Sequence, residues 1–105
     1  MANSFRYGSV KIANETLEVI AKTSAEEVKG VYKSFDDVFG KENDVEAKVF
    51  VNNSILTVDL VLVVIGKLDV RRTVKKIQEN VKRQLEVMTG LKVDRVNVSI
   101  SKLII

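Results

Sequence analysis

The chain has 105 residues, 46% hydrophobic and 30% charged, which suits one compact domain with a solvated surface. It has no Cys and no His, which excludes disulfides, thiolate nucleophiles, the usual zinc sites and histidine acid–base catalysis. The longest apolar run, Leu60 to Ile65, is far shorter than the ~20 residues of a membrane-spanning helix. The N-terminus has no signal-peptide pattern, so we expect a single cytoplasmic domain over residues 1–105.

Charge is distributed unevenly along the chain. Residues 1–66 carry seven Lys/Arg and ten Asp/Glu, a balance of −3, whereas residues 67–105 carry ten and four, a balance of +6. Any attraction to anionic partners therefore belongs to the second part.

A first helix is predicted over about residues 14–29. Asn14 is a candidate N-cap, Glu15 and Glu18 suit the positive end of a helix, and Gly30 is a typical stop. Its apolar side combines three larger residues with two alanines, a pattern that favours close packing on a sheet: Leu17, Ile20, Ala21, Ala25 and Val28.

A β-hairpin is predicted next. Apolar and other residues alternate over 45–51, Asn52 and Asn53 tolerate the positive φ of a tight turn, and a second strand starts at Ile55. From Leu60 to Ile65 both faces of that strand are apolar, so we expect this half to be covered on both sides.

A second helix is predicted over about residues 70–89, between a cap at Asp69 and a stop at Gly90. One side forms an apolar stripe of Val70, Val74, Ile77, Val81, Leu85 and Met88. An arc of about 140° on another side carries six cations, namely Arg71, Arg72, Lys75, Lys76, Lys82 and Arg83.

A last strand is predicted over residues 93–101, followed by an apolar tail, Leu103 to Ile105. The order of elements is then α-β-β-α-β. We expect an α+β fold in which both helices pack on one face of a small antiparallel or mixed sheet.

One specific motif is Met88-Thr89-Gly90-Leu91 followed by Val96-Asn97-Val98, and it is accompanied by Gly8 to Ile12, Ile20-Ala21, Glu27 to Val31 and Ile77-Gln78. Together these segments resemble the alkaline-shock-protein (envelope stress response) family of Gram-positive bacteria. Two positions depart from the family pattern: Lys29 replaces a usual Pro, and Ile65 replaces a common aromatic. The resemblance implies a cytoplasmic protein without a known catalytic site, linked to cell-envelope homeostasis and held near the membrane by partner proteins.

The six cations of the second helix have two interpretations. They can bind phosphates of acidic lipid or of nucleic acid. They can also be a solvated face, partly neutralised by Glu79 and Glu86 at helical spacing from Lys75, Lys82 and Arg83.

Apolar residues near the C-terminus form a second candidate site. The strand residues and the tail that can build a protein interface are Leu60, Leu62, Val64, Leu103, Ile104 and Ile105. The interface can serve self-association or a protein partner, including a membrane-anchored one. The alternative is a cover from within the chain, by Phe5, Tyr7, Val10 and Ile12 or by Phe35 and Phe39.

Other function classes have less support. A KH-type nucleic-acid module uses a Gly-x-x-Gly loop, which the sequence lacks. The acidic residues Asp36, Asp37, Glu42 and Asp44 match no calcium loop. We therefore expect no enzyme, no cofactor and no small-molecule substrate, but a non-catalytic interaction or scaffold protein, or alternatively an anionic-surface binding module.

Overall fold

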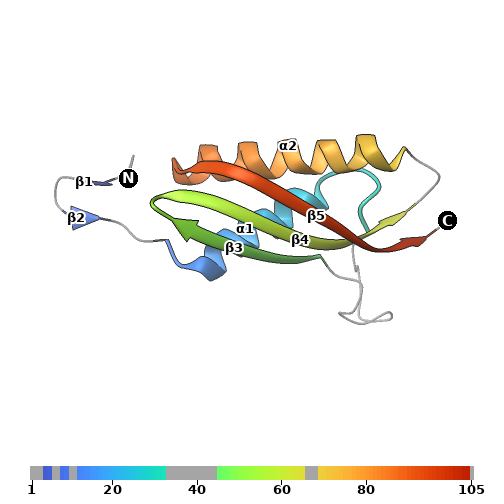
Figure 1. Cartoon of the computed structure of the whole chain (residues 1–105), viewed down its shortest axis with the longest axis horizontal. Helices are drawn as coiled ribbons and strands as arrows, with labels where there is room; N and C mark the ends of the chain where they lie inside the picture. Colours follow the sequence, from blue (N-terminus) through green and yellow to red (C-terminus); the bar gives the residue numbers. More distant parts are fainter. Residues whose placement is uncertain (1–3, 6–7, 10–11, 33–44, 66–68, 105) are drawn as a thin grey trace.

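The computed structural model describes residues 4–5, 8–9, 12–32, 45–65 and 69–104 and has the expected α+β architecture (Figure 1). After a two-stranded pair, β1 (Ser4–Phe5) and β2 (Gly8–Ser9), the main domain follows the order α-β-β-α-β. Its elements are α1 (Asn14–Glu26), β3 (Glu46–Asn52), β4 (Ile55–Ile65), α2 (Val70–Thr89) and β5 (Lys92–Ile104). The sheet is mixed, in the order β3-β4-β5. α1 packs over β3 and α2 over β5, and the helices contact each other.

The β3–β4 hairpin turns through Asn53 and Ser54, which have φ of 51° and 64°. Positive φ at both central residues is typical of a type I′ turn, whose twist matches that of the flanking strands. The predicted turn, Asn52-Asn53, was therefore one residue too early, since Asn52 still pairs with Ile55.

β5 lies parallel to β4, because α2 carries the chain back along the sheet (Figure 1). Register shifts between the pairs of Leu56/Thr57 and of Leu62/Val63 leave Asp94 and Ser101 of β5 as extra residues. The strand continues to Ile104, so Leu103 and Ile104 are strand residues, not a free tail.

Both helices differ from prediction at particular positions. α1 begins after Ala13, and Asn14 does not cap it: the Asn14 side-chain amide donates to the Val49 carbonyl at 3.2 Å. α2 has the predicted cap, since Asp69 accepts from the backbone N–H of Arg71 and Arg72, and Gly90 ends it with φ of 73°. Met88 does not belong to the buried stripe of α2, because it is 63% exposed.

The core fills the space between the sheet and the two helices. Ala21 and Ala25 of α1 are fully buried, and their small side chains let α1 pack closely against the rest of the core. Buried Ser24 donates to the Ile20 carbonyl at 2.7 Å, and among the described residues no buried side-chain nitrogen or oxygen lacks a hydrogen-bond partner. The other fully buried side chains in this layer include Leu17, Val49, Leu56, Val58, Leu60, Leu62, Val64, Ile77, Val81, Leu85 and Val93.

The last part of β4 is paired on both edges. β5 lies on one side, and on the other Val31 bridges Val64 while the Tyr32 N–H donates to the Val63 carbonyl at 2.8 Å. The expectation that residues 60–65 are covered on both faces of the sheet is confirmed only in part. Val63, on the face away from the helices, is 1% exposed, but Val61 and Ile65 on that face are 37% and 39% exposed.

Candidate interaction surfaces

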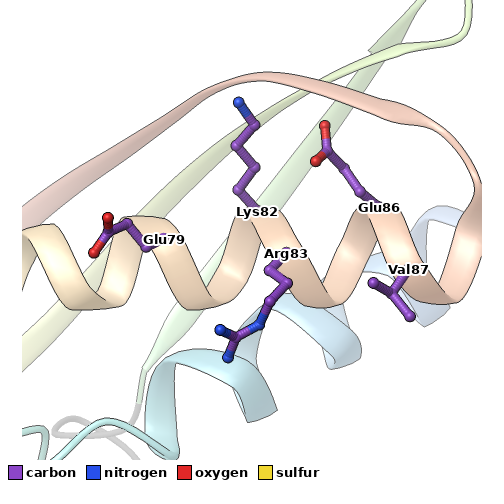
Figure 2. Close-up of a pocket in the computed structure, with 5 residues that line it drawn as sticks. All are labelled: Glu79, Lys82, Arg83, Glu86 and Val87. Atoms are coloured by element: carbon purple, nitrogen blue, oxygen red, sulfur yellow. The ribbon is translucent and has the colours of Figure 1, made fainter.

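The six cations of α2 are all exposed and form two rows. Gln78 donates to the Val96 carbonyl at 3.0 Å and Glu86 accepts the Val93 N–H at 3.0 Å, so the side of α2 between these two residues faces β5. At 100° per residue, one row falls on that side: Arg71, Lys75 and Lys82. The other row turns toward α1: Arg72, Lys76 and Arg83. Figure 2 shows the separation, with Lys82 and Glu86 pointing toward β5 and Arg83 toward α1.

Two polar neighbours of these cations, Glu86 and Asn80, form hydrogen bonds within the domain. The carboxylate of Glu86 bonds to the backbone of β5, and the Arg83 guanidinium donates to Asn80 Oδ1 at 2.5 Å. Asn80 also donates to the Ser24 carbonyl at 2.7 Å and to Glu27 Oε1 at 3.1 Å, which joins α2 to α1. Glu86 and Asn80 therefore hold α2 against its neighbours, Glu86 against β5 and Asn80 against α1.

The positions of the cations within α2 do not favour helix stability. Arg71, Arg72, Lys75 and Lys76 occupy the first two turns, the first turn contains no acidic residue, and the last turn contains no basic one. The helix macrodipole disfavours a cation in the first turn by roughly 0.3–1 kcal/mol, which applies to Arg71 and Arg72. Stability of the helix therefore does not explain why the cations gather at this end.

The predicted apolar interface is divided by the fold. Leu60, Leu62 and Val64 are 0–1% exposed and lie in the core under the helices, so their side chains do not form a surface. Leu103 is 45% exposed and Ile104 is half-buried, while Ile105 lies outside the described residues.

The opposite face of the sheet carries exposed apolar side chains, of which those of Val61 and Ile65 were expected to be covered and that of Phe50 was not considered. No helix or strand among the described elements packs on this face. At one end Phe50, which pairs with Thr57, is 52% exposed near Ile55, which is 41% exposed; Val61 and Ile65 lie toward the other end. The centre of the face is polar, since Asn97 donates to Asp59 Oδ1 at 2.8 Å. The candidate covers Tyr7, Val10, Phe35 and Phe39, and the acidic residues 36–44, lie outside the described residues, and the side chain of Phe5 is not described.

Helix side chains close part of both sheet edges. On β3, Val49 donates its N–H to Glu18 Oε2 at 3.2 Å and its carbonyl accepts from Asn14. On β5, Glu86 and Gln78 do the same for Val93 and Val96. No local pattern in the sequence indicates these bonds, because each joins residues whose proximity depends on how the helices lie on the sheet.

The cavities along α2 are open and lined by charged side chains. One of about 350 Å³ is lined by Glu79, Lys82, Arg83, Glu86 and Val87 (Figure 2). Another of about 400 Å³ lies between the helices, with Glu27, Lys29, Lys76 and Arg83 in its lining. Among the described residues, no three His, Cys, Asp or Glu side chains are placed to hold a metal ion. In the same part of the chain, no helix has both the length and the apolar character needed to cross a membrane.

Comparisons with known proteins agree with the fold and the resemblance. A sequence model of the alkaline shock protein 23 family, described by a cell envelope-related function, matches residues 2–105. The uncharacterized protein YqhY of Bacillus subtilis (strain 168) is 33% identical over 101 residues, which cover 89% of this chain and 75% of that protein. Two variants of the MamM CTD have a similar fold. One has a TM-score of 0.51 at 18% identity, covering 86% of this chain and 99% of that one. The other has 0.51 at 17% identity, covering 84% and 90%.

Proposed function

The chain belongs to the alkaline shock protein 23 family, which has a cell envelope-related function, and on that premise we propose that it is a non-catalytic interaction protein. In this proposal it binds a protein partner through the side of the sheet that the helices leave open. It acts in the cytoplasm, and a partner brings it to the membrane.

The observation that carries the proposal is the exposed face of the sheet. Phe50 and Ile55 lie diagonally on neighbouring strands near the hairpin and are 52% and 41% exposed; Val61 and Ile65, toward the other end of the face, are 37% and 39% exposed. No described helix or strand packs on them. Large apolar side chains exposed next to each other on one face of a sheet are typical of a surface that contacts another macromolecule. The charged, open cavities along α2 give no comparable support to a small-molecule site, because such sites are mostly apolar and enclosed.

Site-specific photocrosslinking in cells tests this proposal. A photoreactive phenylalanine replaces Phe50 on the open face or, as the matched control, Val19, which is 61% exposed on α1. Because both positions are exposed, neither replacement should disturb the fold. We expect adducts of defined mass from position 50 and none from position 19. Adducts from position 19 alone, or from neither position, would contradict the proposal.

A second candidate function is binding to an anionic surface through α2. It is favoured by the four cations in the first two turns, which lie against the helix dipole. If it holds, replacing Arg72, Lys76 and Arg83 by Gln should abolish binding to vesicles that contain acidic lipid, with little change in stability. Flotation of the two proteins with such vesicles measures this, and equal binding by the wild type and the triple variant would remove the candidate.

A further inference from the structure

Among the described residues, nothing pairs with the outer edge of the sheet around Val98 and Ile100, in the second half of β5. The N–H of Val93 and the carbonyl of Val96 face this edge, where they bond to Glu86 and Gln78. The backbone groups of Val93 and Val96 face the same edge because Asp94 is an extra residue between them. Backbone groups alternate along a strand, so the N–H and carbonyl groups of Val98 and Ile100 face this outer edge as well. Within the described residues, no side chain hydrogen-bonds to the backbone of Val98 or Ile100.

The central strand differs from this stretch, because β4 is paired along both edges, by β5 on one side and by β3 and residues 31–32 on the other. The outer edge of β3 is closed at Val49 by Glu18 and Asn14, as that of β5 is at Val93 and Val96. An unpaired strand edge is a template for another strand, so an extended segment can be added to β5 at Val98 and Ile100.

The surroundings of the open edge are positively charged. α2 runs antiparallel to β5, so its first half, residues 70–79, lies beside the second half of β5, residues 98–104 (Figure 1). Together these two stretches contain five Lys or Arg residues and one acidic residue, Glu79. On the side of α2 toward β5 lie Arg71 and Lys75, and β5 itself contributes Arg95 and Lys102, all four of them exposed.

We propose that an extended, acidic segment of a partner protein adds to β5 as a fourth strand at Val98 and Ile100, with its carboxylates near Arg71, Lys75 and Lys102. This rests on the proposed function and specifies the chemistry of the partner. Main-chain hydrogen bonds give the attachment, and the cations select for acidic side chains.

A second copy of the chain fits this edge less well. Antiparallel pairing of two β5 strands near Ile100 would bring together the first turns of two α2 helices, with Arg71 and Lys75 from both copies. Like charges at short range oppose that arrangement. Lys102 and the irregularity at Ser101 also deter indiscriminate strand pairing, whereas an acidic strand would neutralise the lysine.

Three synthetic peptides of about eight residues test the proposal by fluorescence anisotropy with the full chain. The probe alternates Glu and Val, one control alternates Lys and Val, and the other repeats Glu-Glu-Pro-Pro. The Glu/Pro peptide keeps the negative charge, but Pro occupies both odd and even positions, so N–H groups that a strand needs are missing in either register. We expect the Glu/Val peptide to bind at least about tenfold more tightly than either control, and to bind less tightly as salt is raised.

Variants of the protein locate the site. Ile100→Pro removes an N–H that faces the open edge and not β4, a position where strands tolerate proline, so it should retain the fold and weaken Glu/Val binding at least about tenfold. A charge variant keeps the strand unchanged in case the proline unfolds the chain: Arg71→Gln, Lys75→Gln and Lys102→Gln should together weaken binding about tenfold. The matched control removes the same charge from the other side of α2, by Arg72→Gln, Lys76→Gln and Arg83→Gln, and should bind nearly as the wild type does.

The results that overturn the inference are distinct. Equal binding of Glu/Val and Glu/Pro peptides would mean attraction to charge alone, as expected for a lipid or nucleic-acid surface. An equal loss of Glu/Val peptide binding in the two triple variants would place the site elsewhere on α2. If light scattering shows a dimer that Ile100→Pro abolishes, the edge is instead occupied by a second copy of the chain. A failure here leaves crosslinking from position 50 unaffected, so a failure of the inference is distinguishable from a failure of the proposed function.

Discussion

Truncating Leu62 should destabilise the domain strongly, because the fold places this residue in the core and not on a surface. Leu62 is 0% exposed, in the central strand under both helices. Replacing a fully buried Leu by Ala costs about 2–5 kcal/mol, through lost transfer free energy and the cavity left behind. A domain of this size has a free energy of unfolding of about 5–15 kcal/mol, so the variant loses a large share of it.

Leu103→Ala is the matched control, since it removes the same atoms from a side chain that is 45% exposed. We expect a loss of about 1 kcal/mol there. Urea unfolding followed by circular dichroism measures the free energy of unfolding of both variants. In a separate thermal melt, a loss of ~3 kcal/mol in Leu62→Ala should lower Tm by roughly 12–24 °C. If Leu62→Ala costs no more than Leu103→Ala, the assignment of Leu60, Leu62 and Val64 to the core is refuted.

Two further predictions concern local features of the fold. Ser54→Gly should raise the free energy of unfolding by roughly 0.5–1 kcal/mol, because Ser54 has φ of 64° and Asn-Gly is the preferred type I′ pair; a lower Tm in differential scanning calorimetry would contradict this account of the turn. Asn80→Ala should lower the free energy of unfolding by about 1–3 kcal/mol, because the variant loses the hydrogen bonds to Ser24 and Glu27 that join the two helices. Unchanged unfolding of Asn80→Ala in urea would show that these bonds contribute nothing net.

The parts of the fold that could be predicted depend on local signals. α2 has its predicted bounds because Asp69 and Gly90 act within one turn of the helix they delimit. The cap of α1 was wrong because the Asn14 amide bonds to Val49, 35 residues away, and no local pattern indicates such a contact.

The candidate sites needed the arrangement of the sheet. A strand that is apolar on both faces, such as Leu60 to Ile65, does not indicate which face meets the helices, and alternation along β5 is compatible with parallel or antiparallel pairing. The cations of α2 were found from the sequence, but their division into two rows requires the position of β5, which Gln78 and Glu86 mark.

Amide hydrogen exchange of β5, followed by NMR in the dilute pure protein, tests most directly whether the chain keeps an edge open for a partner. The N–H groups of Asn97 and Ser99 face β4 and should exchange slowly, whereas those of Val98 and Ile100 should exchange quickly. The Val49 N–H, held by Glu18, serves as a protected reference on the other edge. Alternation along β5 is the result that the account predicts, and uniform protection from Asn97 to Ile100 would contradict it, because the edge would then already be covered.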